Sequence, residues 1–164
     1  MQTGKPGHLA SFDYVGPHRY SLTFCAHNRD RLFSVADRVD LVWEQILRAA
    51  REQAGAIVAA CFMPDHLHIL IEMESESSDC LQFISRAKQF SGFLFKQRFG
   101  RSLWQRYSYD RVLRAEEQTL VVARYIFENP VRAGLVERPE DYPFSRSEKY
   151  TVRQVLEAVQ MMSG

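Results

Sequence analysis

Two apolar runs separated by only two residues constrain the fold of this chain more than any other feature. The runs "AIVAACFM" (56–63) and "HLHILIEM" (66–73) have the length and composition of β-strands. Pro64-Asp65 between them is a turn sequence. Because so short a connection joins antiparallel strands, we expect a β-hairpin with the other elements arranged around it.

The segments on either side of this hairpin alternate between strand and helix. In chain order we expect a strand at 18–27, a helix between an N-cap at Ser34 and Gly55, the hairpin, a helix from Ser78 or Asp79 to Phe99 with Gly100 after it, a strand or a strand and turn at 102–114, a helix from Glu116 and Glu117 to Pro130, and an amphipathic helix at "TVRQVLEAVQMM" (151–162). This β-α-β-β-α-β order predicts an α+β fold. The sheet is expected to be ferredoxin-like and antiparallel, with additional C-terminal helices.

A chain of 164 residues fits one domain. We expect an N-terminal extension at 1–17, the main domain at 18–147 and a C-terminal helical tail at 148–164. No stretch approaches the roughly 18–20 apolar residues that cross a bilayer, and no signal-peptide pattern opens the chain, so we expect a cytoplasmic protein. The cysteines are odd in number and widely spaced, which favours buried reduced thiols over a disulfide or a zinc site. They are Cys25, Cys61 and Cys80.

Positive charge is concentrated in one part of a nearly neutral chain. The net charge is +1, but residues 85–115 carry 8 basic side chains and one acidic side chain, Asp110, for a net of +7. The flanking segments 1–84 and 116–164 have net charges of −4 and −2. A localised basic block suggests a localised anionic partner such as a nucleic acid, with an ordinary solvated face as the alternative.

Two histidines lie one residue apart at the start of the second hairpin strand. Because side chains alternate along a strand, His66 and His68 share one face. The other face is uniformly apolar, with Leu67, Ile69 and Ile71, and must be packed by helices. Two imidazoles aimed the same way can bind one cation. The alternative is a pair of half-exposed histidines that only close the hairpin, since an H-x-H pattern alone is weak evidence.

A tyrosine in "VVARYIFENP" (121–130) is the second candidate for chemistry. Apolar residues form one arc of this helix, and Tyr125 and Asn129 lie together at its margin, four residues apart. Placed over the histidine face, the two side chains offer a nucleophile and an amide oxygen that can bind a metal. The alternative is a half-buried tyrosine whose hydroxyl points into water, which is common on helices.

Four motifs follow one another in the chain: "HRYSLTFCAHNRDRLF", "MPDHLHILIE", "LWQRYSYDRVLR" and "ARYIFENPVRAGLV". Together they resemble the single-tyrosine HUH transposases, and more closely the REP-associated tyrosine transposases of bacterial chromosomes. The resemblance spans His18 to Ser147. It departs at Arg111, where relatives often have histidine, so we assign no chemistry to that position.

The resemblance implies a transposase that cleaves and rejoins single-stranded DNA at hairpin-associated, REP-like sites. Tyr125 would be the nucleophile and would form a covalent 5′-phosphotyrosine. His66, His68 and Asn129 would hold a divalent metal, Mg²⁺ or Mn²⁺, and the imidazole and amide ligands lean towards manganese. Rejoining would need no ATP, because the phosphotyrosine conserves the energy of the phosphodiester, and the chain contains no P-loop.

Basic and aromatic residues alternate between Arg86 and Arg114, as in proteins that bind single strands, although the aromatics at helical spacing are expected in the core. The DNA contacts that we expect are Lys88, Gln89, Arg106 and Tyr107. The implied partner is single-stranded or hairpin DNA, bound by a nucleoid-associated monomer or homodimer.

Two other interpretations stay open. A domesticated relative that binds structured DNA without cutting it would keep the basic block but would not depend on a metal. A replication or plasmid-mobilisation nuclease with the same histidine motif would have a different sequence around its tyrosine, so "YIFENPVRAGLV" counts against it.

Overall fold

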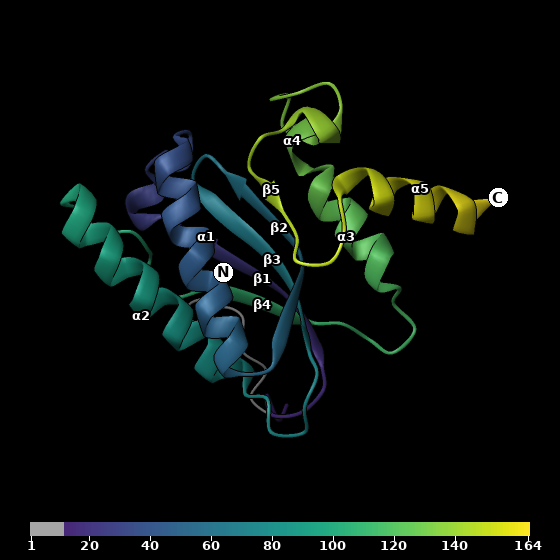
Figure 1. The fold of residues 1–164 in the computed structure, drawn as a ribbon, viewed down its shortest axis with the longest axis horizontal. Helices are drawn as coiled ribbons and strands as arrows, with labels where there is room; N and C mark the ends of the chain where they lie inside the picture. Colours follow the sequence, from purple (N-terminus) through teal and green to yellow (C-terminus); the bar gives the residue numbers. More distant parts are fainter. Residues whose placement is uncertain (1–11) are drawn as a thin grey trace, which may run out of the picture.

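The computed structural model describes residues 12–164 and has a five-stranded antiparallel sheet between two layers of helices (Figure 1). The strand order is β4-β1-β3-β2-β5. In chain order the elements are β1 (Arg19–Cys25), the 3-10 helix η1 (His27–Arg29), α1 (Ala36–Glu52), β2 (Gly55–Met63), β3 (His66–Met73), α2 (Cys80–Phe99), β4 (Tyr109–Val112), α3 (Thr119–Phe127), α4 (Asn129–Arg132), the 3-10 helix η2 (Pro139–Asp141), β5 (Ser145–Arg146) and α5 (Val152–Ser163).

The predicted β-hairpin forms the centre of the sheet. β2 pairs with β3 directly up to the two-residue turn, and β3 pairs along its other edge with β1. On β1, Cys25 is the partner of His66, and Thr23 is the partner of His68. Both histidines therefore lie on a strand that has hydrogen-bonded neighbours on each side.

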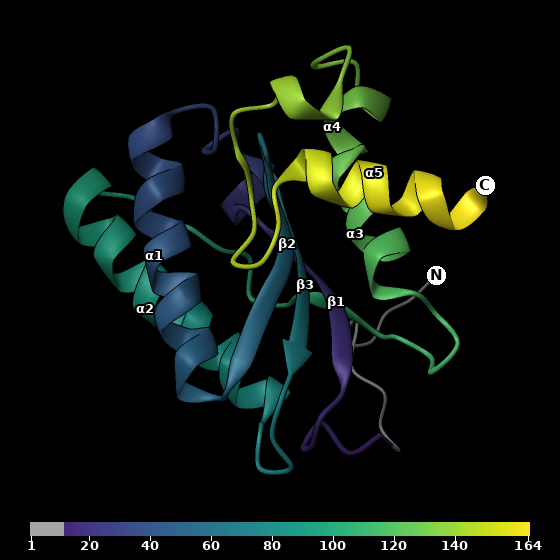
Figure 2. The same ribbon diagram turned by 45° about the vertical axis from the view of Figure 1, so that its right-hand side comes forward.

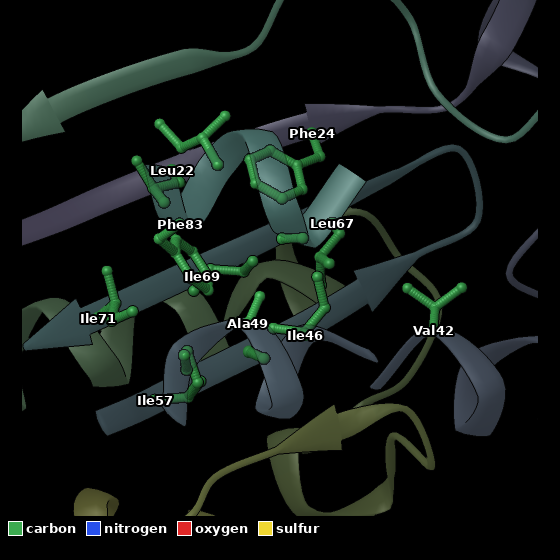
Figure 3. Packing of buried hydrophobic residues seen from close by; sticks show 14 of the residues in the cluster. Leu22, Phe24, Val42, Ile46, Ala49, Ile57, Leu67, Ile69, Ile71 and Phe83 are labelled. Atoms are coloured by element: carbon green, nitrogen blue, oxygen red, sulfur yellow. The ribbon is translucent and has the colours of Figure 1, made fainter. Parts of the chain in front are cut away.

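Helices α1 and α2 pack on one face of the sheet and enclose the main core (Figures 1 and 2). From β3 this core receives Leu67, Ile69 and Ile71, all fully buried. Figure 3 shows them in the same cluster as Ile46 of α1 and Phe83 of α2. The alternation of apolar residues along the strand predicted the packed face correctly.

The opposite face of the sheet is covered by α3 and α5 (Figure 2). A second core forms there around Leu70 of β3, with Ile126 and Phe127 from α3 and Val155 and Val159 from α5. The two predicted metal-binding histidines belong to the same face as Leu70. Their side of the sheet is therefore not an open surface, because α3, with the predicted nucleophile, packs against it.

The predicted fold class is confirmed, since the strands and helices occur in the order β-α-β-β-α-β and are followed by further helices. Some boundaries were wrong. Ser34 is not the N-cap of α1; Val35 is, in an extended conformation and without a side-chain hydrogen bond. The expected strand at 102–114 is shorter, because only Tyr109–Val112 pairs continuously with β1, and β5 was not predicted.

The ends of the later helices follow their capping residues. Asp79 is the N-cap of α2, and its carboxylate accepts a hydrogen bond from the backbone N–H of Gln82 at 3.0 Å. Gly100 ends α2 with a φ of 73°, which favours glycine. The third helix stops at Phe127, three residues before the expected end, and Pro130 lies instead in the first turn of α4, where no N–H is needed.

Residues of the expected N-terminal extension and of the expected C-terminal tail contribute to the two cores. Residues 1–11 of the N-terminal extension lie outside the described residues, but Tyr14 is buried in the main core. In the C-terminal tail, α5 packs against α3. Cys25, Cys61 and Cys80 are buried and form no disulfide, as predicted. Within residues 12–164 no helix has the length and apolarity to span a membrane.

Candidate active site

The turn of the central hairpin brings two imidazole nitrogens face to face. Nε2 of His66 lies 3.2 Å from Nε2 of His68, and the two rings are perpendicular. The side chains point to the same face because they are two residues apart on β3. Both nitrogens can therefore reach one cation at the usual metal–nitrogen distance of about 2.0–2.1 Å.

Asp65, the second residue of the turn, orients His66. Nδ1 of His66 donates a hydrogen bond to Oδ1 of Asp65 at 2.7 Å, and Nε of Arg29 donates to Oδ2 at 3.0 Å. Burial alone would raise the pKa of Asp65, but these hydrogen bonds and charges lower it, so Asp65 is a carboxylate. In the neutral ring, a proton on Nδ1 leaves the lone pair on Nε2, directed at His68.

His68 is held in the neutral form that binds metals. Burial, followed by electrostatic interactions with His66 and Arg132, lowers its pKa to about 4. Nδ1 of His68 lies 3.1 Å from Oγ1 of Thr23, its neighbour on β1. When Nδ1 of His68 donates to the hydroxyl, Nε2 of His68 carries a lone pair, as Nε2 of His66 does.

These contacts fit a divalent metal. Metal-binding histidines usually give their second nitrogen to a carboxylate or another oxygen, as His66 does to Asp65 and His68 can do to Thr23. In the part of the chain that the structure describes, no further histidine, cysteine or carboxylate joins the pair to make a group of three. Among the described residues, a third protein ligand would then be of another type, such as the amide oxygen of Asn129, which borders the same cavity as His68.

The α3–α4 segment faces His68 across a cavity of about 200 Å³, and His66 is not among the residues that line it. Its lining residues are Ser21, Thr23, His68, Arg111, Val122, Tyr125, Ile126, Asn129 and Arg132. The predicted nucleophile, two of the three predicted metal ligands and the hydroxyl that contacts His68 thus border one space within a single chain. Tyr125 is 64% exposed, so its phenol is accessible to a large substrate.

Sequence reasoning missed several residues of this cavity. Thr23 and Ser21 alternate along β1 on the histidine face, but their place beside His68 depends on the pairing of β1 with β3. Arg132 lies seven residues after Tyr125, which is the spacing of one helix face. Arg111, to which we assigned no chemistry, also lines the cavity.

The four expected DNA contacts lie outside this cavity and in two places. The ammonium group of Lys88 donates to the carbonyl oxygens of Gln105 and Arg106 at 3.1 and 3.4 Å, and burial lowers its pKa to about 8. Arg106 and Tyr107 are exposed neighbours, with the guanidinium 5.3 Å from the ring centre. Gln89 lies apart from them on the outer face of α2, where it accepts a hydrogen bond from Arg86.

Comparisons with known proteins relate this chain to transposases. The family model described as "Transposase IS200 like" matches residues 14–129, a range that contains both histidines, Tyr125 and Asn129. A Haemophilus influenzae protein named "Putative REP-associated tyrosine transposase" is 30% identical in an alignment of 99 positions, which covers 54% of this chain and 56% of that protein. The match thus spans only about half the length of that relative.

A solved structure with the same fold contains a bound hairpin. It is a REP-associated tyrosine transposase bound to a REP hairpin, and it superposes with a TM-score of 0.69 at 20% sequence identity. The alignment covers 85% of this chain and 81% of the other. This similarity extends beyond the sheet, since the aligned share is too large for the β-α-β-β-α-β core alone.

Proposed function

Because the chain belongs to the family of IS200-like transposases, we propose that it cleaves and rejoins single-stranded DNA by means of Tyr125 and a divalent metal. The observation that carries this proposal is the common cavity of Tyr125, Asn129 and His68. A nucleophile and two candidate metal ligands that border one space are the minimum that metal-assisted transfer to a tyrosine requires.

The reaction is a transesterification. The phenol oxygen of Tyr125 attacks the phosphorus of a DNA phosphodiester, and the bond from phosphorus to the 3′ oxygen breaks. The phenol loses its proton, and the leaving oxygen gains one to become a 3′-hydroxyl. One phosphodiester bond is lost and one phosphotyrosine bond is formed, so attack by another 3′-hydroxyl restores a DNA strand without ATP.

The chain's own residues prepare this step. His66, His68 and Asn129 would hold the metal, which when bound acts as a Lewis acid on the phosphate oxygens. Asp65 fixes the ring of His66, and Thr23 lies against His68. Since His68 is uncharged near neutral pH, its ligand nitrogen is available without loss of a proton.

Hairpin-associated, REP-like DNA is the substrate class that we propose. The solved relative with the same fold is bound to a REP hairpin. We propose that the protein is associated with the nucleoid, where such DNA is found. The exposed Arg106 offers a cation and the exposed Tyr107 offers a stacking surface for an unpaired strand. We further propose that the active site is complete within one chain, because Tyr125 and His68 already border the same cavity.

The test is incubation of the purified protein with hairpin oligonucleotides that have single-stranded flanks and a 3′-terminal label, in the presence of Mn²⁺. A covalent protein–DNA adduct should form with the wild type and should be absent from Tyr125→Phe and from wild type treated with a chelator. An adduct that persists in Tyr125→Phe would show another nucleophile. Tight hairpin binding without any adduct or cleavage would favour the binding protein instead.

A further inference from the structure

The cavity beside Tyr125 contains a positive charge that no carboxylate of residues 12–164 neutralises. The guanidinium carbon of Arg132 lies 3.8 Å from the centre of the Tyr125 ring. Its Nη2 also donates a hydrogen bond to the carbonyl oxygen of Tyr125 at 2.7 Å. Within residues 12–164, Arg132 forms no ion pair. The contacts of the Arg132 guanidinium that the described residues show are thus with Tyr125.

The other arginine of the cavity is in a different state. Nη1 of Arg111 donates to both carboxylate oxygens of Glu117, at 2.8 and 2.7 Å. The hydrogen bond from Arg111 is the main cause of a lowered pKa at Glu117, so the two side chains form an ion pair. The charge of Arg111 is therefore compensated, and Arg132 is the arginine left to receive an external anion.

Helix geometry explains why Arg132 reaches this position. Tyr125, Asn129 and Arg132 are spaced by four and three residues, and Glu128 joins α3 to α4 with helical backbone angles. The three side chains therefore share one face and line the same cavity. His68 of β3 lines the same cavity as Arg132.

We propose that Arg132 binds the phosphate that Tyr125 attacks and holds the Tyr125 ring beside it, which deepens the function proposed above and depends on it. The ring is largely exposed, so without a partner it would be free to leave the cavity. A guanidinium has five N–H donors in a rigid plane, and most of them stay available for phosphate oxygens after the contact with the Tyr125 carbonyl. The phosphate would then be bound on one side at β3, where the metal ligands lie, and on the other side by Arg132 of α4.

The first test compares single-turnover cleavage by wild type and Arg132→Met, which keeps an unbranched side chain and loses the charge and the donors. The cleavage rate at saturating DNA should fall by about 10- to 100-fold, as expected when a phosphate donor and the orientation of a nucleophile are lost. The dissociation constant for DNA should change much less, because other basic residues supply most phosphate contacts. Arg132→Lys keeps the charge without the planar fork and should be intermediate.

The second test separates a direct role from a structural one. In Arg132→Ala the space of the side chain is empty, and free guanidinium ion, below denaturing concentrations, should raise the cleavage rate of this variant. The same addition should not accelerate wild type. Arg138→Ala serves as the matched control, since Arg138 is exposed, pairs with Asp141 and does not line the cavity. Its cleavage rate should equal that of wild type with or without guanidinium.

The outcomes distinguish this inference from the proposed function. If wild type forms no adduct, both fail. If wild type forms the adduct and Arg132→Met forms it equally fast, or loses only DNA affinity, then Arg132 does not act in cleavage although the proposed function stands. If the variants melt at lower temperature, the guanidinium experiment decides, because a folding defect is not reversed by guanidinium. Absence of rescue, together with an Arg132→Lys variant that is as slow as Arg132→Met, would overturn the inference.

Discussion

The carboxylate of Asp65 lies 2.7 Å from Nδ1 of His66. The two residues are neighbours at a hairpin turn, and the sequence alone identifies Asp65 only as a turn residue. Arg29 binds the other oxygen of the same carboxylate. This pair fixes the direction of the His66 lone pair before any metal binds. The turn therefore has a task in the site as well as in the fold.

Asp65→Ala should weaken metal binding without unfolding the protein. The hydrogen bond to Nδ1 of His66 would be lost, and loss of such an outer contact typically reduces metal affinity by about 10- to 100-fold. Calorimetric titration with Mn²⁺ measures the change. Asp37→Ala is the control, because Asp37 is 71% exposed and pairs only loosely with Arg98. Equal Mn²⁺ affinity in Asp65→Ala and wild type would mean that Asp65 is only a turn residue.

The partly buried, neutral state of His68 predicts a pH dependence of folding stability. Its pKa is lowered from 6.5 to about 4, so between these values the unfolded chain binds a proton that the folded protein does not. The contribution of His68 to the free energy of unfolding is fully present above about pH 6.5. It is lost as the pH falls towards 4, and it amounts to at most about 3 kcal/mol. Urea unfolding with a chelator present measures it. The curves of wild type and His68→Gln should converge as the pH falls, and parallel curves would contradict the burial of a neutral His68.

Mixing experiments test whether one chain supplies the whole site. His68→Ala lacks a metal ligand, and Tyr125→Phe lacks the nucleophile. A mixture of the two variants should form no covalent adduct, since His68 and Tyr125 of the same chain border one cavity. Wild type mixed with Tyr125→Phe is the control for inhibition by an inactive partner. Adduct formation by the two variants together would show that a second subunit delivers the tyrosine.

Arg106 and Tyr107 should contribute to DNA binding in different ways. Arg106→Gln removes a charge, so the slope of log affinity against log salt should fall by about one. Tyr107→Leu removes a stacking surface and should cost about 1–3 kcal/mol of binding free energy with little change in the slope. Fluorescence anisotropy with a single-stranded flank at several salt concentrations measures both. Two variants with wild-type affinity and slope would place the DNA elsewhere.

The second core should be more important for cleavage than for metal binding. Phe127 is fully buried between α3 and the sheet, and Phe127→Ala should lower the free energy of unfolding by about 3–5 kcal/mol. Helix α3 would then be loosened, while the hairpin that bears the histidines is supported by the main core. Cleavage should fall further than Mn²⁺ affinity. Phe83→Ala, in the main core, should instead impair both.

The sequence was sufficient where the relevant geometry is local. The period of two along β3 placed His66 and His68 together, and the spacing of four residues placed Tyr125 beside Asn129. It was insufficient for Thr23, since contact with His68 depends on the pairing of distant strands. Nor could local pattern show that α3 and α5 cover the histidine face, because such packing is decided by the whole fold.

Arg132 is a different case. Its spacing of seven residues from Tyr125 fits one helix face, but the proline between them predicts that the helix ends before Arg132. The sequence pattern predicts that the helix ends at Pro130, and residues beyond a helix end do not belong to its face. In the structure Pro130 lies in the first turn of α4, which continues the direction of the chain closely enough for Arg132 to reach the Tyr125 ring. A proline that predicts the end of one helix can therefore lie in the first turn of the next, with residues on both sides of it on one face.

The most direct test is identification of the amino acid joined to DNA. After reaction with a hairpin oligonucleotide and Mn²⁺, the adduct would be digested and the linked peptide mapped by mass spectrometry. We predict a 5′-phosphate linked to Tyr125, in a peptide that contains "YIFENPVR", together with a free 3′-hydroxyl on the released strand. DNA attached to another residue such as Tyr107 or Tyr109, or cut strands with no protein attached at any time, would contradict the account.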